Sequence, residues 1–329
     1  MGNVSIKDIA KLTGVSTATV SRVINDSGRF SEETRQKVMD TINKLGYRSN
    51  VVAKSLRTRK TLSIGVIVPD ITNEFFSKIV LGIESYCFPK GYSVYICNTG
   101  ENEEKENLYI ADLEAKGVDG LIYLSEVGGQ QYQISKRRIP TVCIDREPLK
   151  KDIPVITSDN YNGGFIATEE LIRCGCKNIV LLRDYRVLST MEQRTQGYMY
   201  ALSQYDIPVD VNMILKMPID FNSAKECVEK LIASKTKFDG IFATTDWLAI
   251  GALSALKKHR IKVPQEVRLV GFDNTSITEF ISPSITTIDQ DKFKMGDTAA
   301  NILLDMINDH SKKHENIIIP VELIKRETT

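Results

Sequence analysis

Charged, amide and aromatic side chains follow the apolar, strand-like runs of residues 61–329, close to where each run ends. The set consists of Asp70, Asn73, Phe75, Phe76, Asp145, Arg146, Arg194, Phe221, Thr245, Asp273 and Gln290. Carboxylate, guanidinium and amide groups hold hydroxyl groups through paired hydrogen bonds, and aromatic rings stack on apolar C–H faces. A sugar offers both kinds of surface, so this set predicts a site that binds a sugar.

The same region offers little for catalysis or metal binding. The chain has three histidines, His259, His310 and His314, and none of them belongs to the set. Cys174 and Cys176 are the only close pair among six cysteines, and no histidine stands near them to complete a metal site. We therefore expect binding rather than turnover, with no catalytic residue, no metal and no cofactor apart from a small-molecule effector.

Several residues of this region also have a simpler structural explanation. Asn73 and Asp246 could each serve only as a helix N-cap, and Phe75 and Phe76 could belong to the core. The position of the set after strands in both halves of the body favours a pocket over these separate explanations. Trp247, the only tryptophan, directly follows Asp246 and is expected near the mouth of the cleft, with no role beyond packing.

A second kind of chemistry is expected near the N-terminus. Residues 1–60 carry a formal charge of +7 and the remainder carries −6, although the whole chain is close to neutral at +1. A basic segment joined to an acidic body predicts contact with a polyanion.

The pattern of residues 1–47 predicts three short helices. Ser5, Ser16 and Ser31 stand where N-caps are expected, and Gly14 breaks the chain between the first two helices. The second helix, Ser16 to Asn25, has a small polar outer face that fits the major groove of DNA, where Arg22 can pair with a guanine edge. The predicted DNA contacts of this helix-turn-helix are Ser5, Ser16, Thr17, Ala18, Thr19, Ser21, Arg22, Asn25 and Ser31.

Apolar runs rich in Val, Ile and Leu alternate with helical patterns in the body. They are Leu62–Val68, Tyr92–Cys97, Gly120–Leu124, Thr141–Ile144, Ile179–Leu182, Gly240–Ala243, Leu269–Phe272 and Ile285–Gln290. Such runs with helices between them are typical of parallel sheets covered on both faces, and the series is long enough for two α/β lobes. Ligands of these folds bind beyond the carboxyl ends of the strands.

The chain resembles the LacI/GalR family of transcription regulators. The resemblance is carried by Ile6-Lys7-Asp8-Ile9-Ala10, Gly14-Val15-Ser16, Thr19–Asn25, Ser31–Arg35 and Leu45-Gly46-Tyr47, and it continues to Pro320–Ile324. It implies a small all-α helix-turn-helix head and an α/β body of two doubly wound parallel-sheet lobes, of the periplasmic-binding-protein type I. It also implies a homodimer that binds a palindromic double-stranded DNA operator.

The resemblance further implies three parts along the chain. Residues 1–47 form the DNA-binding domain, 48–60 a hinge, and 61–329 the ligand-binding and dimerisation domain. Its N-lobe covers about 61–158 and 290–318, and its C-lobe about 159–289 and 319–329. The hinge folds on DNA in this family, with Asn50, Ala53 and Leu56 as contacts and Leu56 wedged between base pairs. Ser49 and Val51 depart from the proline and alanine usual there.

The polar set is similar to the pocket of ribose-binding proteins and ribose repressors, where the Asn-x-Phe-Phe and Asp-Arg elements close around a pentose. Thr245 stands where asparagine is usual, which points to a change in the preferred sugar. We therefore expect a repressor whose operator affinity is controlled by ribose or a similar pentose or hexose, acting as an inducer.

Three alternatives stay open at this point. One is a regulator of the same family that uses a purine or phosphoprotein corepressor. Another is a cytoplasmic solute-binding module, and the third, an enzyme, is opposed by the missing catalytic groups. No apolar run approaches the ~20 residues that span a bilayer, and no secretory signal is recognisable, so we expect a cytoplasmic protein without a membrane partner.

Overall fold

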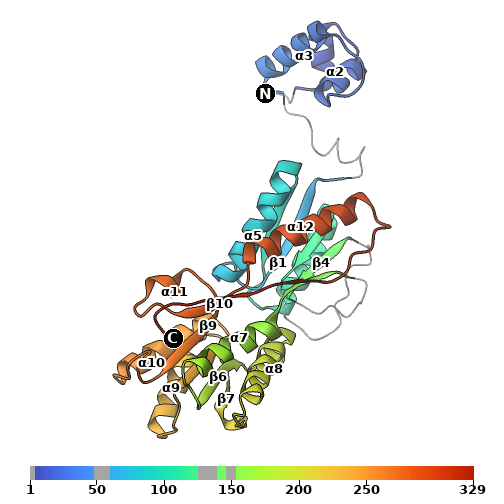
Figure 1. Cartoon of the computed structure of the whole chain (residues 1–329). Helices are drawn as coiled ribbons and strands as arrows, with labels where there is room; N and C mark the ends of the chain where they lie inside the picture. Colours follow the sequence, from blue (N-terminus) through green and yellow to red (C-terminus); the bar gives the residue numbers. More distant parts are fainter. Residues whose placement is uncertain (1–3, 48–59, 125–138, 146–152) are drawn as a thin grey trace. The chain divides into compact units, whose positions relative to one another are not determined.

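The computed structural model describes residues 4–47, 60–124, 139–145 and 153–329. The chain divides into two compact units, residues 1–61 and 62–329, and each is described by itself (Figure 1). Four of the expected contact residues, Asn50, Ala53, Leu56 and Arg146, lie outside the described residues.

The first unit contains the three predicted helices, α1 (Ile6–Thr13), α2 (Thr17–Ile24) and α3 (Glu32–Leu45). Each begins after a serine whose side chain accepts a hydrogen bond from a backbone N–H of the first turn, and Ser5 and Asp8 form a complete capping box. Gly14 ends α1 with a φ angle of 70°, which a residue with a side chain adopts at a cost. These local signals explain why the helix-turn-helix was predictable.

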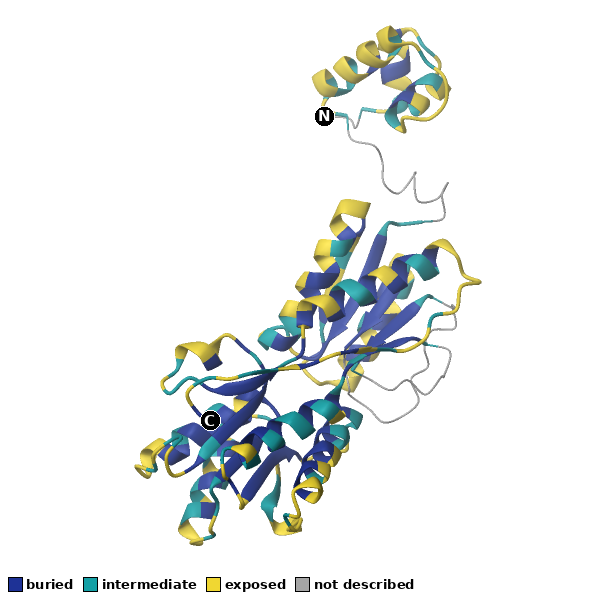
Figure 2. Cartoon of the chain, in the orientation of Figure 1, coloured by how far each residue is buried: buried dark blue, intermediate teal, exposed yellow. Residues whose placement is uncertain are grey.

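The core of this unit is small. Ile9, Val20 and Val38, one from each helix, are fully buried, and their contacts fix the angle between α1, α2 and α3. The outer faces of the helices stay exposed (Figure 2). The unit thus combines a small apolar core with a polar, exposed surface.

The second unit contains two six-stranded sheets within the described residues, and Figure 1 shows them one after the other along the unit. The first has the order β11-β5-β4-β3-β1-β2, and the second β12-β10-β9-β8-β6-β7. The strands of the first sheet are β1 (Ser63–Val68), β2 (Ser93–Asn98), β3 (Gly120–Tyr123), β4 (Thr141–Ile144), β5 (Val155–Ser158) and β11 (Ile317–Ile319). Those of the second are β6 (Ile179–Asp184), β7 (Ile214–Met217), β8 (Gly240–Ala243), β9 (Arg268–Asp273), β10 (Thr286–Asp289) and β12 (Glu322–Ile324).

Helices cover both faces of each sheet, as the continuous apolar runs predicted. We call the first sheet with α5 (Glu74–Cys87), α6 (Glu103–Lys116) and α12 (Lys292–Asn308) the N-lobe. The C-lobe is the second sheet with α7 (Asn160–Arg173), α8 (Ser189–Gln204), α9 (Phe221–Ala233), α10 (Asp246–Lys258) and the short α11 (Ile277–Phe280). Two 3₁₀ turns, η1 (Phe88–Lys90) and η2 (Val211–Met213), complete the assignment for the described residues.

The chain crosses between the lobes three times, from β5 to α7, from β10 to α12 and from β11 to β12. The ladders are parallel, as predicted, except that β12 runs antiparallel to β10. The exception has a simple cause: β12 enters the second sheet from the crossover side, where the other strands of that sheet end. With only Pro320 and Val321 after β11, the chain has no room for the connection that a parallel strand needs.

Close helix packing fixes the position of α8. A Cβ on Gly164 of α7 would overlap the carbonyl of Arg194, and one on Gly197 of α8 would overlap the carbonyl of Tyr161. The two glycines therefore let α7 and α8 approach within backbone contact. This contact holds the α8 backbone that carries Arg194 in one place.

No helix among the described residues combines the length and the apolar character that crossing a membrane requires.

Candidate functional site

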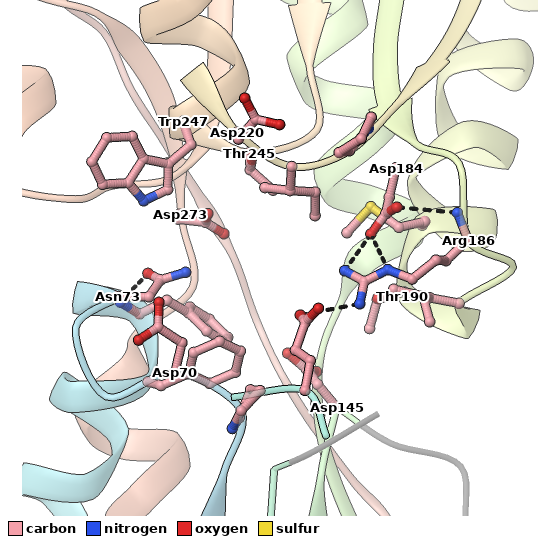
Figure 3. A pocket seen from close by; sticks show the side chains of 18 of the residues that line it. Asp70, Asn73, Asp145, Asp184, Arg186, Thr190, Asp220, Thr245, Trp247 and Asp273 are labelled. Atoms are coloured by element: carbon pink, nitrogen blue, oxygen red, sulfur yellow. Dashed lines mark hydrogen bonds and ion pairs between the residues drawn. The ribbon is translucent and has the colours of Figure 1, made fainter. Parts of the chain in front are cut away.

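A cavity of about 630 Å³ lies between the lobes, at the carboxyl ends of strands from both sheets (Figure 3). Residues of the predicted set that line it are Asp70, Asn73, Phe75, Phe76, Asp145, Arg194, Phe221, Thr245 and Asp273. Gln290 does not line the cavity but is fully buried behind it. These side chains lie together because the carboxyl ends of parallel strands meet at one edge of each sheet, where ligands of such folds bind.

Arg194 is the most strongly held side chain of the cavity wall. Its Nε donates to Asn160 Oδ1 at 2.8 Å, its Nη1 to the Thr244 carbonyl at 2.5 Å, and its Nη2 to Gln290 Oε1 at 3.3 Å. The guanidinium carbon also lies 3.7 Å from the centre of the Phe272 ring. A planar, permanently charged group fixed in this way can donate to a ligand without losing side-chain entropy.

Asp273 stands beside Arg194 at the inner end of the cavity. Its Oδ1 accepts a hydrogen bond of 2.6 Å from Gln290 Nε2 and lies 3.9 Å from Arg194 Nη1. Burial raises the pKa of Asp273 to about 8; the nearby Arg194 opposes that shift and Asp246 adds to it. Gln290 therefore acts as a support that orients both groups rather than as part of the wall.

Two of the cavity's carboxylates have unusual backbone geometry. Asp145 has a φ angle of 50° and Asp273 one of 115°, both in a region that residues with side chains rarely adopt. Asp145 accepts hydrogen bonds from Thr157 Oγ1 at 2.8 Å and from the Ser158 N–H at 3.2 Å. Burial raises the pKa of Asp145 as well, against the effect of Arg194. Backbone strain of this kind is typical of ligand sites.

The capping explanation and the pocket explanation both hold for Asn73. Its side chain accepts from the Phe75 N–H at 3.0 Å as the N-cap of α5, and it lines the cavity. For α10 the cap is Thr245, which also lines the cavity, and not Asp246. Asp246 is instead buried, and it accepts hydrogen bonds from Thr275 and Thr287.

Phe75 and Phe76 contact each other edge to face, with ring centroids 5.2 Å apart and planes at 77°. Phe75 is buried and Phe76 half-buried, so the pair belongs to the core of the N-lobe and to the cavity wall together.

A large part of the cavity wall was not among the predicted residues. The missed lining residues are Pro69, Thr72, Glu101, Leu124, Asp184, Tyr185, Arg186, Leu188, Thr190, Met191, Pro218, Ile219, Asp220, Asn222 and Trp247. Trp247 lies on the cavity wall, as expected for a residue near the cleft mouth, and at 41% exposure it is not packed away from the cavity. Asp184 was missed because β6 extends two residues beyond the predicted end at Leu182. The only available signal was the pair Arg183-Asp184 after that apolar run.

Two polar contacts join the lobes beside the cavity. Arg186 binds Asp184 of the C-lobe and forms an ion pair of 3.0 Å with Glu101 of the N-lobe. Glu74 accepts hydrogen bonds from the Ser276 N–H at 2.9 Å and from Ser276 Oγ at 2.5 Å. Burial pushes the pKa of Glu74 upward, but the Ser276 hydrogen bonds outweigh it and hold that pKa below its usual value. These contacts stabilise the present spacing of the lobes.

The raised pKa of Asp273 predicts that binding of a ligand with hydroxyl groups strengthens with pH. A hydroxyl donates more strongly to an ionised carboxylate, so binding must release the proton that Asp273 holds below about pH 8. We expect affinity to rise by up to about tenfold per pH unit below that value and to level off above it. Calorimetry across pH measures this, and Asp273→Asn should flatten the profile.

The same raised pKa of Asp273 predicts that the stability of the folded protein decreases as the pH rises. Between the unfolded pKa of about 3.9 and the folded pKa, the native chain holds a proton that the unfolded chain has lost. The contribution of Asp273 to stability is therefore present at low pH and is lost as the pH rises through about 8. A stability contribution of Asp273 that grows with pH in this window would contradict the assigned shift.

The outer surface of α2 carries the predicted DNA contacts. Ser16, Thr17, Ala18, Arg22 and Asn25 are exposed. Other expected contacts already take part in local hydrogen bonds. The Ser5 hydroxyl donates to Asp8 Oδ2 at 2.6 Å, and the Ser31 hydroxyl lies 2.8 Å from Thr34 Oγ1. Thr19 and Ser21 are half-buried.

Metal binding finds no support in the described ranges, which contain no group of three or more His, Cys, Asp or Glu side chains arranged to hold an ion.

Family models match both units. Residues 5–50 match the model of bacterial regulatory proteins of the lacI family, and residues 61–327 match that of periplasmic binding proteins and the sugar binding domain of the LacI family. The chain is 35% identical to the HTH-type transcriptional regulator RegA of Clostridium saccharobutylicum, over 99% of both chains. It is also 35% identical to the HTH-type transcriptional repressor PurR of Vibrio cholerae, over 98% of this chain and 97% of that one.

The chain is also similar to solved structures of regulators. The lac repressor dimer bound to operator and the anti-inducer ONPF superposes with a TM-score of 0.87, at 26% identity over 100% of this chain and 99% of that one. A LacI-type regulator of Alkaliphilus metalliredigens complexed with D-xylulofuranose gives 0.72 at 34% identity, over 81% and 98%. One of Enterococcus faecium with bound ribose gives 0.73 at 29% identity, over 81% and 98%.

The chain belongs to the LacI family of bacterial regulatory proteins. It is a DNA-binding transcriptional regulator with a ligand-binding domain, and its relatives are regulators rather than enzymes.

Proposed function

We propose that this protein is a transcription repressor whose affinity for a palindromic operator is lowered by a sugar, ribose or a similar pentose or hexose, bound between the lobes. The observation that carries the proposal is the inner end of the cavity. There Arg194, Asp273 and Asp145 converge from both lobes beside the Phe75 ring. Fixed donors, fixed acceptors and an aromatic face are what a sugar ring requires.

The charge of the wall supports a sugar over a purine. Its carboxylates far outnumber its cations among the described residues: Asp70, Glu101, Asp145, Asp184, Asp220 and Asp273 stand against Arg186 and Arg194. A sugar presents a donor at every hydroxyl, whereas a purine presents few donors on a broad apolar face. The relatives crystallised with ribose and D-xylulofuranose support the same choice.

A purine is the second candidate, because relatives named PurR are 35% identical to this chain over nearly its whole length. Under that alternative the ligand acts as a corepressor and strengthens operator binding. Whether the ligand weakens or strengthens operator binding therefore distinguishes a sugar inducer from a purine corepressor.

On the DNA side, we propose that two copies pair through their bodies and place two α2 helices in successive major grooves. Arg22 reads a base edge, and the hydroxyls of Ser16 and Thr19, with Asn25, contact phosphates. Ser5, Thr17, Ala18, Ser21 and Ser31 complete the proposed contacts, and the hinge with Asn50, Ala53 and Leu56 enters the minor groove. Such a protein works in the cytoplasm, where the DNA is.

A thermal-shift screen tests the effector directly. At a hundredfold excess over its dissociation constant, a ligand that binds only the folded state adds about 2.7 kcal/mol of stability. We expect ribose, xylulose or a related sugar to raise the melting temperature, and adenine, guanine and hypoxanthine to leave it unchanged. A shift with a purine and none with any sugar would refute the proposal.

A further inference from the structure

The cavity has a buried inner end and an exposed outer end. Phe75, Arg194, Thr245 and Asp273 at the inner end are buried. The exposed lining residues at the outer end are Asp70, Thr72, Glu101, Tyr185, Pro218, Asp220, Asn222 and Trp247. A single sugar ring at the inner end therefore leaves the polar and aromatic side chains of the outer end without contact to the ligand.

The volume leads to the same conclusion. A pentose has about ten non-hydrogen atoms, and covalently bonded atoms each occupy less than the ~30 Å³ of a separate water molecule in the liquid, so the pentose fills less than about 300 Å³. That is less than half of the 630 Å³ cavity. The same upper bound for a disaccharide, with about 23 such atoms, is about 700 Å³, so two rings fit the cavity better than one.

Trp247 is exposed at the outer end, although its neighbours in the sequence are buried. It is 41% exposed, while its neighbours Asp246 and Leu248 are 1% and 0% exposed. In Figure 3 its indole lies on the same side of the cavity as Asn73 and Asp70, opposite Asp184 and Arg186. A large aromatic ring that stays exposed on a polar cavity wall offers the flat apolar face on which sugars stack.

The backbone beneath Trp247 is held firmly. Asp246 accepts hydrogen bonds from the Thr275 N–H at 2.7 Å, Thr275 Oγ1 at 2.9 Å and Thr287 Oγ1 at 2.7 Å. Thr245 caps the same helix by accepting from the Leu248 N–H. The indole is thus mounted on a fixed helix start, so stacking on it costs little conformational entropy.

Acceptors for a second ring stand at the same end. The pKa of Asp220 lies below its usual value, because hydrogen bonds from Ser223 stabilise the charge, so this carboxylate is ionised at neutral pH. Asn222 and Asp70 also line the outer end. Ionised acceptors around an exposed aromatic face suit the hydroxyls of a sugar ring.

We propose that Trp247 is the platform of an outer sugar subsite, so that the cavity accepts a second ring joined to the pentose or hexose of the proposed function. This inference rests on the proposed function. The first ring binds beside Arg194 and Asp273 at the inner end, and the second stacks on the Trp247 indole. Trp247 is then a specificity-determining residue that discriminates by ligand length.

The full chain allows an unambiguous test, because Trp247 is its only tryptophan. Calorimetry would compare ribose, xylulose, glucose and galactose with maltose, cellobiose, lactose, sucrose and trehalose. We expect at least one disaccharide to bind about tenfold or more tighter than the monosaccharides, and to shift the tryptophan emission to shorter wavelength as the indole is covered.

Variants separate stacking from packing. Trp247→Ala should weaken the disaccharide by about tenfold or more and change monosaccharide affinity by less than about twofold, whereas Trp247→Phe should keep most of the disaccharide affinity. Tyr200→Ala serves as a matched control, because Tyr200 is a 45% exposed aromatic of the same lobe outside the cavity. It should leave both affinities unchanged.

The possible outcomes are distinct. If a monosaccharide binds and no disaccharide binds tighter, or if emission stays constant during measured disaccharide binding, the outer subsite is refuted while the proposed function stands. Equal losses for both ligand lengths in Trp247→Ala refute it too. If no sugar binds at all and a purine does, the proposed function and this inference fall together.

Discussion

Replacing Asp273 with alanine is expected to weaken sugar binding by about a hundredfold or more when binding is measured above about pH 8, where the carboxylate is ionised. The carboxylate stands at the buried inner end of the cavity, where water cannot replace it, and Gln290 and Arg194 hold it in place. Hydrogen bonds to a charged group contribute about 1.5–3 kcal/mol each. Losing two of them to one sugar costs about 3–6 kcal/mol, or at least about two powers of ten in the dissociation constant.

Calorimetric titration with the best sugar of the thermal-shift screen measures this loss. Glu226→Ala is the matched control, since it removes an exposed carboxylate of the C-lobe that does not line the cavity. Sugar affinity in Asp273→Ala within about threefold of the parent protein would show that the inner end is not the binding site.

Replacing Arg22 with alanine is expected to remove most of the sequence preference of the head. Arg22 is exposed on α2, and its aliphatic stem lies near the turn at Gly28, where a Cβ would come within 3.4 Å of Arg22 Cδ. A bidentate pair between arginine and guanine discriminates against a wrong base by about 1–3 kcal/mol. Affinity for the operator should fall about five- to 150-fold, while affinity for unrelated duplex changes far less.

The operator for this experiment comes from selection on a random duplex library with the full chain. Lys44→Ala, in the last turn of α3, is the control that removes one positive charge of the head without touching α2. It should weaken operator and unrelated duplex alike, through phosphate contacts only. An Arg22→Ala variant that keeps the full ratio between operator and unrelated duplex would exclude Arg22 as a base reader.

Much of the fold was predictable because its signals are local. Serine caps and Gly14 define the helices of the head, and the buried runs of β1, β4 and β8 are continuous in the sequence. The strands β5, β7, β11 and β12 escaped prediction. Each is three or four residues long and contains at least one residue that is not buried, so neither length nor apolar continuity marks them. The antiparallel direction of β12 follows from the path of the third crossover, which no local pattern reveals.

The inner end of the cavity was also predictable, because residues after parallel strands must meet at one edge. Of the outer end, only Asp70 belonged to the predicted set. Arg183 and Asp184 continue β6 as buried charges because Arg183 donates to Thr195 and Glu192 on the next helix, α8, and a strand pattern does not reveal such partners. Trp247 was expected near the cleft mouth, but its exposure on the cavity wall depends on the three-dimensional position of the Thr245–Leu248 turn and could not be read from the sequence.

Polar contacts join the lobes beside the cavity. Glu101 forms an ion pair with Arg186, and Glu74 accepts a hydrogen bond from Ser276. A ligand that binds one spacing of the lobes more tightly than another shifts the balance between them by its difference in affinity, and by no more. In a regulator with a ligand-binding domain and a DNA-binding domain, this difference in ligand affinity is what changes the affinity for DNA.

The most direct measurement is operator binding by the full chain, with and without a sugar at a concentration that calorimetry shows to be saturating. The account predicts that the saturating sugar raises the operator dissociation constant about five- to 150-fold, which corresponds to a coupling of about 1–3 kcal/mol. An operator affinity that stays constant or increases while the cavity is demonstrably filled with sugar would contradict it.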